Sequence, residues 1–501
     1  MQNNRLILWA VFGLLAFMIF SKWQTANLPP VPQTTETAQV SANSSTTANS
    51  SVPTIGTSNM PSSVGSTQID ATKTITVTTD VLSVELSPMG GDIISVELLK
   101  YSESLEAKDQ PFELLSSSNN RLFVSQTGLA GPKDNQQANF SHEVGPFVAS
   151  EASYQLVDGQ ESLVVPLTYT DATTGSVLTK TYTFTKGRYD VGFEQTITNH
   201  SSTPWVGGSY VALVQKDPMI SGHLMGASSY TGPVFSMGEE AYTKVPFDKT
   251  SNEGVVVNGT QGWGAMIQQY FTSAWLSLND RPTAVKVAKD PNINGAAFVL
   301  LNDTQGVTVQ PGAAHSFANK LYIGPKIKQD LVNAGEYTYV NGKGEQEKGN
   351  AKLELTLDYG WFSPISALML WVLEFFHGIV GNWGWSIVLL TFAVKLLLYP
   401  FSEKGYRSMA KMRHLAPEMQ RLKELYGSDR QKIGQETLAL YRKEKVNPMG
   451  GCWPMLIQIP IFIALFWMLQ ESVQLRQAPW ILWIHDLAIM DPYFVLPIIM
   501  C

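Results

Sequence analysis

Two long apolar runs enclose a short basic loop in the C-terminal part of this 501-residue chain. Residues 383–401 and 452–470 are each close to the ~20 apolar residues that a helix needs to cross a bilayer. Between them, residues 402–451 carry 11 Lys and Arg against 6 Asp and Glu. Such an excess in a short loop marks the cytoplasmic side of a membrane. The pattern predicts two transmembrane helices joined by a cytoplasmic helical hairpin.

A long acidic block precedes these runs. Residues 70–358 hold 31 Asp and Glu against 20 Lys and Arg, and a block of this length translocates largely regardless of charge. If it lies outside and the basic loop inside, an odd number of crossings must separate them. Residues 361–381 are therefore expected to form an amphipathic helix in the outer interface rather than another span. The apolar stripe predicted for this helix consists of Ile365, Leu368, Met369, Val372, Leu373, Phe376, Ile379 and Val380, with Ser363, Ser366, Glu374 and His377 off it.

The N-terminal residues have the pattern of a membrane anchor followed by a linker. Residues 1–23 include an unbroken apolar run and no A-x-A cleavage site follows, which favours an uncleaved transmembrane anchor with a cytoplasmic N-terminus. A cleaved signal peptide is the alternative. Residues 24–69 are rich in Ser, Thr and Pro, with Glu36 as the one charge, which is typical of a disordered linker.

The acidic block has the pattern of β-strands. Residues 178–184 alternate with period two, residues 185–188 form a turn, and residues 189–198 follow as the next strand. The same pattern predicts four more strands, at 163–169, 296–301, 307–309 and 317–323. Asp158-Gly159 and Asn258-Gly259 are expected to be turns. Because no helix-length apolar period competes, we predict one large antiparallel β-sandwich without disulfides.

Signatures of catalysis are absent from the sequence. It contains no G-x-x-x-x-G-K-[ST], G-x-G-x-x-G, H-E-x-x-H or G-x-S-x-G, and its two Cys are far apart. We therefore expect no ATPase, no other enzyme activity, no metal and no cofactor. An alternative class is a tethered periplasmic sugar-binding or mutarotase-like protein, whose candidate acids and bases are His142, His200, His223 and His315.

One cation lies inside the first long apolar run. Placing Lys395 near the bilayer centre costs roughly 2.5–3.5 kcal/mol, so such residues usually face a bundle interior or a wet cavity. Thr391 shares its helix face, one turn away. In the second run Gln458 is polar and lies between Pro454 and Pro460, whose freed carbonyls need partners. These residues predict a hydrophilic groove open to the cytoplasm, with snorkelling of Lys395 as the alternative.

The loop between the runs has helical spacing and many cations. Its apolar seam comprises Met412, Leu415, Met419, Leu422 and Tyr426, then, beyond a break at Gly427-Ser428, Ile433, Leu438, Leu440 and Tyr441 up to Asn447-Pro448. The cations include Lys404, Arg407, Lys411 and Arg413. Two hypotheses stay open: the basic hairpin binds anionic lipid, or it binds ribosomal RNA or a nascent chain.

Several ordered motifs resemble one family. They are GNWG at 381–384, SMAKMR at 408–413, EKVNP at 444–448, GGC at 450–452, LIQIPIF at 456–462, LRQAP at 475–479, WIHDL at 483–487 and DPY at 491–493. This run resembles the YidC/Oxa/Alb family of membrane protein insertases. The anchor, linker, acidic domain and interfacial helix are similar to the Gram-negative form.

The resemblance implies a function and partners. It implies insertion and folding of newly made proteins in the bacterial inner membrane, alone or with the Sec translocon, with the ribosome as a further candidate partner and no DNA. It implies a mutarotase-like supersandwich for residues 70–358. Residues 471–492, which come after the second apolar run, are expected to form a periplasmic loop. Lys395 matches the family's groove cation, which is usually arginine, and Thr391 matches a groove residue. Family members continue beyond a helix that starts at 493–501 here, so an incomplete helical core is expected. A structural Sec accessory subunit is a third alternative.

Overall fold

The structure is a computed structural model that describes residues 74–118, 120–131, 140–218, 229–277, 281–340, 346–427, 429–444 and 453–500. The expected anchor and linker at 1–69 lie outside these residues, as do His223 and Asn447-Pro448. The backbones of Lys404 and Pro454 are described within helices, whereas their side chains are not.

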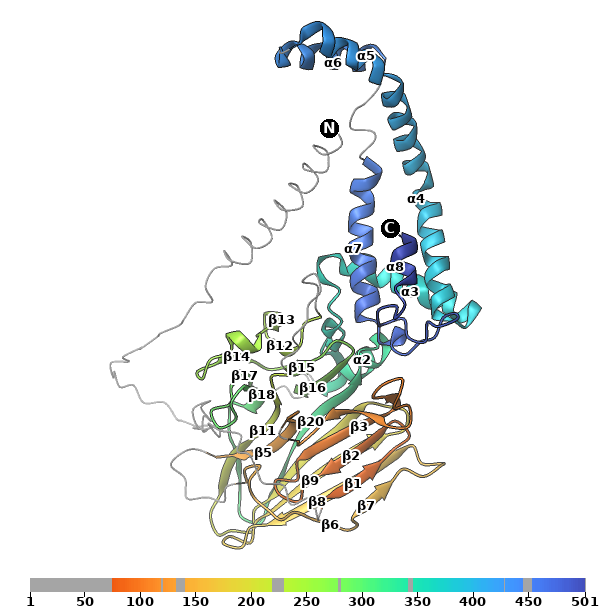
Figure 1. The fold of residues 1–501 in the computed structure, drawn as a ribbon. Coiled ribbons are helices and arrows are strands. Elements are labelled where there is room, and N and C mark those ends of the chain that lie inside the picture. Colours follow the sequence, from red (N-terminus) through yellow and green to blue (C-terminus); the bar gives the residue numbers. More distant parts are fainter. Residues whose placement is uncertain are drawn as a thin grey trace, which may run out of the picture. The chain divides into compact units, whose positions relative to one another are not determined.

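Two large sheets make up the acidic domain (Figure 1). Among the described residues the first sheet has 11 strands, β14-β17-β18-β11-β5-β3-β2-β1-β7, with β19 on β11 and β4 on β3. The second has nine, β13-β12-β15-β16-β20-β10-β9-β8-β6. The predicted fold class, a large β-sandwich joined to apolar helices, is confirmed.

The strands have the following bounds. The first sheet contains β1 (Ile75–Thr78), β2 (Leu82–Leu86), β3 (Ile93–Ser102), β4 (Pro111–Leu115), β5 (Phe123–Ala130), β7 (Ser153–Gln155), β11 (Trp205–Lys216), β14 (Val255–Gly259), β17 (Thr283–Lys289), β18 (Ala296–Asp303) and β19 (Val307–Val309). The second contains β6 (Val148–Ala149), β8 (Ser162–Thr170), β9 (Val177–Thr185), β10 (Asp190–Thr198), β12 (Gly232–Met237), β13 (Glu240–Lys244), β15 (Gly262–Ile267), β16 (Phe271–Ser277) and β20 (Ala314–Pro325). A separate hairpin is made of β21 (Glu336–Val340) and β22 (Gln346–Asn350).

Alternating side chains explain why β9 and β10 form and pair. Along β9 every second residue is buried, as successive side chains of a strand point to opposite faces. The turn between the strands includes Gly187, whose φ of 71° favours glycine. The pairing joins Val191 to Phe184 and continues to Thr198 and Val177. This confirms the hairpin predicted from the sequence.

Three sequence predictions for this domain were wrong in detail. Strands β1 and β7 pair in parallel, so the sandwich is not wholly antiparallel. Asn258 and Gly259 lie within β14, opposite Ala284 and Thr283, rather than in a turn. A short helix, α2 (Lys328–Gly335), follows β20, although no helix was expected here. Its eight residues are too few for an apolar period to stand out.

The remaining helices occupy the C-terminal part (Figure 1). They are α3 (Ser363–Val380), α4 (Trp383–His414), α5 (Ala416–Tyr426), α6 (Arg430–Lys443), α7 (Trp453–Glu471) and α8 (Val495–Met500), with 3₁₀ turns η5 (Leu353–Thr356), η6 (Gly360–Phe362) and η8 (Val473–Leu475). A further 3₁₀ turn, η4 (Phe247–Lys249), lies between β13 and β14. Gly381, with a φ of 66°, ends α3, and the Asn382 side chain accepts a hydrogen bond from Trp385 N to begin α4. Helix α4 continues through Pro400 to His414, so the first predicted span and the start of the predicted hairpin share one helix.

The buried face of α3 differs from the predicted stripe. Ser366, Met369, Leu370 and Leu373 are buried, whereas Leu368 is 60% exposed. The Ser366 hydroxyl donates a 2.9 Å hydrogen bond to the Ala464 carbonyl of α7. A serine placed off the apolar stripe is therefore part of the contact between two helices, because its polar group finds a partner there.

Candidate functional site

Helix α4 carries the predicted groove cation. Lys395 is exposed, and it is the one charged residue between 383 and 401. Phe392 and Leu396 beside it are also exposed, so its surroundings on the helix are apolar. Its ammonium makes no ion pair with any residue that the structure describes. A cation on this surface is available to a group that approaches from outside the chain.

The other predicted groove residues lie on both helices. The Thr391 hydroxyl donates a 2.8 Å hydrogen bond to the Val388 carbonyl of its own helix. Gln458 is half-buried on α7, and Pro460 lies inside the same helix. Within the described ranges, no hydrogen bond joins these α4 residues to those of α7.

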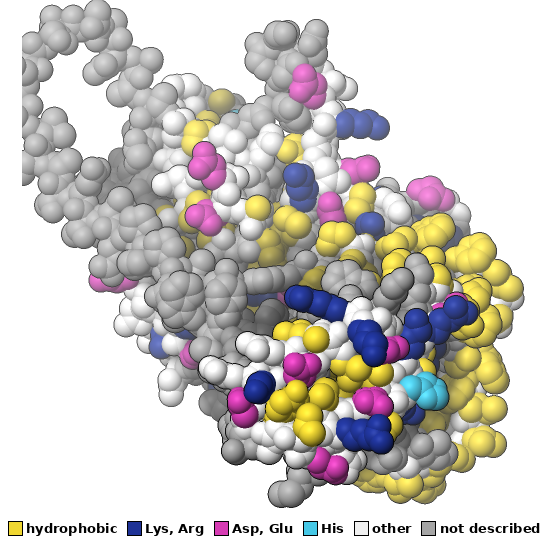
Figure 2. All heavy atoms as spheres, turned by 90° about the horizontal axis from the view of Figure 1, so that it is seen from above, with side chains coloured by type: hydrophobic (Ala, Val, Ile, Leu, Met, Phe, Trp, Pro, Cys, Tyr) yellow, Lys and Arg dark blue, Asp and Glu magenta, His cyan; other side chains and the backbone are white. Residues whose placement is uncertain are grey.

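The apolar surfaces of the helices are suited to lipid. By length and composition α3 and α4 could each cross a membrane, and residues 455–471 form a shorter apolar helix. Seen from above, hydrophobic side chains gather along one side of the molecule, and Lys and Arg side chains are scattered over the near face (Figure 2). Because α3 is, like α4, long and apolar enough to cross a membrane, its interfacial position remains a prediction.

The basic hairpin is held by few contacts. Tyr441 of α6 donates a hydrogen bond to the Met419 sulfur of α5 over 3.2 Å, which joins the two halves of the predicted seam. Gly427, with a φ of 52°, follows α5, and Asp429 caps α6. Arg407 is paired with Glu403 one turn away. Lys411 and Arg413 form no ion pair with residues in the described ranges, so both charges are open to an anionic partner.

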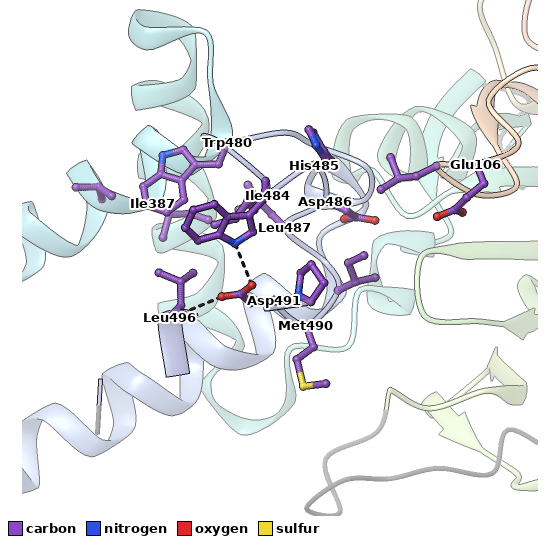
Figure 3. A pocket seen from close by; sticks show the side chains of 16 residues that line it. Glu106, Ile387, Trp480, Ile484, His485, Asp486, Leu487, Met490, Asp491 and Leu496 are labelled. Carbon is purple, nitrogen blue, oxygen red and sulfur yellow. Dashed lines mark hydrogen bonds between the residues drawn. The ribbon is translucent and has the colours of Figure 1, made fainter. Parts of the chain in front are cut away.

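A pocket of about 400 Å³ lies between the start of α4 and the residues that follow α7. Its apolar wall includes Ile387, Trp480 and Leu487 (Figure 3). Asp491 accepts hydrogen bonds from Trp483 Nε1 at 3.0 Å and Leu496 N at 2.9 Å, and the backbone bonds in particular lower the pKa of this carboxyl. The residues from the WIHDL and DPY motifs thus form one local structure, which the motifs alone did not predict.

Two family models match most of the chain, and relatives align with all of it. The model for the YidC periplasmic domain matches residues 74–372, and the model for the 60Kd inner membrane protein matches residues 375–501. The chain is 39% identical over 508 residues to membrane protein insertase YidC of Nitrosococcus oceani, covering 100% of this chain and 88% of that protein. The chain belongs to the YidC family. A Coxiella burnetii YidC is 38% identical over 519 residues, covering 100% and 86%.

Membership of the YidC family assigns the sandwich domain to the periplasm. Members with this architecture are inner-membrane proteins whose sandwich domain is periplasmic, so the acidic block lies in the periplasm. Among solved structures, a galactose mutarotase related enzyme from Lactobacillus acidophilus is 10% identical, covers 50% of this chain and 97% of its own, and has a TM-score of 0.34.

The candidate histidines of the YidC-family sandwich lie apart in separate surroundings. His142 is 1% exposed, and its backbone N–H and Nδ1 lie 2.8 and 3.1 Å from the Tyr210 hydroxyl. His315 Nε2 lies 3.2 Å from Arg281, whereas His200 is exposed. Among the described residues, no group of His, Cys, Asp and Glu could hold a metal ion. The described histidines therefore do not form one acid–base site.

The burial of His142 predicts a pH effect on stability. Burial, and secondly the Lys180 charge, lower its pKa from 6.5 to about 4. The unfolded chain binds this proton near pH 6.5 and the folded chain only near pH 4, so stability falls as the pH falls across that window. His142→Gln should remove this loss, which amounts to about 3 kcal/mol. Urea unfolding of both proteins in detergent from pH 7 to pH 4 measures it, and parallel pH curves would contradict it.

Proposed function

We propose that the chain inserts newly made membrane proteins into the bacterial inner membrane through a hydrophilic groove whose cation is Lys395. Membership of the YidC family supports the activity. The observation that carries the site is the lone charge of Lys395 on an exposed apolar stretch of α4. Because a charge at this depth is costly, its retention is best explained by contact with a polar segment of a passing chain.

The groove would divide a substrate by polarity. Lys395 attracts acidic groups of the hydrophilic segment, while Thr391, Gln458, Pro454 and Pro460 provide polar side chains and carbonyls that keep the site hydrated. The apolar segment moves along the exposed faces of the helices into lipid. Since no ATPase signature occurs in the sequence, partition of apolar surface into the bilayer supplies the driving force.

The basic hairpin would face the cytoplasm. Lys404, Arg407, Lys411 and Arg413 carry positive charge next to the membrane, where each is worth about 1 kcal/mol against anionic lipid. The same charges suit ribosomal RNA or a nascent chain, and we include the Sec translocon and the ribosome among the partners proposed. This orientation places the N-terminus in the cytoplasm and the sandwich outside.

Lys395→Ala is expected to lower insertion of a small single-span protein with an acidic translocated tail by at least about tenfold, because the groove loses its charge. Lys395→Arg should retain insertion, since the charge remains. Protease protection of the substrate in vesicles that contain the full chain measures the yield. Phe392→Ala is the matched control, as it shortens an exposed side chain on the same helix without changing charge. Equal insertion by Lys395→Ala and wild type would refute the role of Lys395.

A further inference from the structure

The segment that follows α7 is bound to the periplasmic sandwich by side chains from distant parts of the chain. Gln269, between β15 and β16, donates a 3.1 Å hydrogen bond to the Gln470 carbonyl at the end of α7. The next 3₁₀ turn, η8, has Val473 and Leu475 buried at 2% and 3% exposure. The outer end of α7 is therefore packed into the sandwich rather than joined to it by an open loop.

A buried ion pair lies at the centre of this contact. Lys326 directly follows β20, and Glu471 is the last residue of α7. Their side chains are 1% and 2% exposed, and the Lys326 ammonium donates a hydrogen bond to Glu471 Oε2. The Lys326 backbone N–H is itself held by the Tyr270 carbonyl at 2.8 Å. Neither charge can reach water, so removal of either would leave the other buried without its partner.

A second set of contacts lies a few residues further on. Arg476 Nη2 donates to the carbonyls of Ser102 and Glu103 at 2.7 and 3.0 Å. Its guanidinium lies 5.1 Å from the ring centroid of Phe112 and 5.7 Å from that of Phe271. Gln477 and Ser102 exchange side-chain and backbone hydrogen bonds of 3.0 and 3.1 Å. We call Lys326, Glu471 and Arg476, with these partners, the outer clasp.

We propose that the outer clasp positions α7 for insertion, with Lys326 and Glu471 as positioning residues that fix the periplasmic end of this helix on the sandwich. The proposal rests on the proposed function. Gln458 lies 13 residues before Glu471, about 20 Å along the helix, so a small tilt at the clasp displaces the groove residues of α7. The sandwich is then a rigid support for one wall of the groove, in addition to being a periplasmic domain.

Three variants of the full chain in vesicles of phosphatidylethanolamine and phosphatidylglycerol test this proposal. Glu471→Gln and Lys326→Met each break the pair, and the double exchange Lys326→Glu with Glu471→Lys restores opposite charges. Lys244→Met is the control, because the Lys244–Asp358 pair also joins the sandwich to residues before α3 but is partly exposed. Amide hydrogen exchange of η8, of β9 and of β10 is measured beside the rate of substrate insertion.

In each single variant, the amides of η8 should exchange about tenfold faster while those of β9 and β10 stay unchanged. Insertion should slow by at least about fivefold, and the double exchange and the control should stay near wild type. Unchanged insertion despite faster exchange at η8 would overturn the positioning role. Faster exchange in β9 and β10 as well would assign the pair to stability of the sandwich and also overturn it. If the wild-type chain inserts no substrate, the proposed function is refuted. The amide exchange at η8 then shows separately whether the outer clasp fixes the end of α7 on the sandwich.

Discussion

Replacing Lys180 with Met is expected to destabilise the sandwich by about 3–5 kcal/mol. Lys180 lies on β9 and is fully buried between the sheets. Its ammonium donates hydrogen bonds to the Gly90 carbonyl and, at 2.7 Å each, to the carbonyl and hydroxyl of Thr127, and it lies 3.9 Å from Asp92 Oδ1. The substitution leaves these acceptors without this donor. It also leaves the Asp92 carboxyl, which still accepts a 2.9 Å hydrogen bond from Thr127 N, buried without its opposite charge.

The same cluster predicts strong coupling between Lys180 and Asp92. Burial raises the pKa of Asp92 to about 7 and lowers that of Lys180 to about 8. The charge of each group opposes the pKa shift of the other, so each charged form depends on its partner. Asp92→Asn combined with Lys180→Met should therefore cost at least about 1 kcal/mol less than the sum of the single variants. Urea unfolding of the detergent-solubilised chain, monitored by near-ultraviolet circular dichroism, gives the free energy of unfolding for the two single variants and for the double variant. Additive values would show that the two groups do not interact.

Trp275→Ala is expected to lower the free energy of unfolding by about 3–5 kcal/mol, as much as Lys180→Met, because it leaves a cavity between the two sheets. Trp275 of β16 is fully buried, stacks edge-on to Phe193 at 5.3 Å, and donates a 3.0 Å hydrogen bond from Nε1 to the Ser125 hydroxyl of the opposite sheet. Trp275→Phe keeps most of the volume and loses the hydrogen bond, so about 1–3 kcal/mol is expected.

Trp371→Ala is the matched control for this core residue. Trp371 is 63% exposed on α3, and its loss should change the free energy of unfolding by less than about 0.5 kcal/mol. Both variants are measured in the same urea titration. A smaller loss for Trp275→Ala than for Trp275→Phe would contradict the assignment of Trp275 to the contact between the sheets.

Period-two alternation was enough to predict the central strands of the sandwich. It works for β9 and β10 because one face of each strand is buried and the other is not. It could not predict the parallel pairing of β1 with β7, since these strands are far apart in sequence and their pairing depends on the tertiary fold. The alternation at 178–184 puts Lys180 on the same face as Leu178, Tyr182 and Phe184, but it does not reveal Asp92, the charge that makes the burial of Lys180 tolerable.

The candidate groove could be proposed from the sequence because a charge inside an apolar run is conspicuous, and its role stays a prediction. Ser366 was misplaced because its burial depends on the Ala464 carbonyl of α7, a partner 98 residues away. The outer clasp was missed for the same reason, as Lys326 and Glu471 are 145 residues apart and each looks like an ordinary surface charge. Contacts between distant elements are thus the part that only the structure supplies.

Site-specific photo-crosslinking tests most directly whether α4 and α7 line a groove for substrate. A photoreactive residue at Thr391, at Gln458 or, as control, at Ile379 on the exposed face of α3 is combined with a stalled single-span substrate. We expect adducts with the hydrophilic segment of the substrate at Thr391 and Gln458 and none at Ile379. Adducts at Ile379 alone, or equal adducts at all three positions, would contradict it.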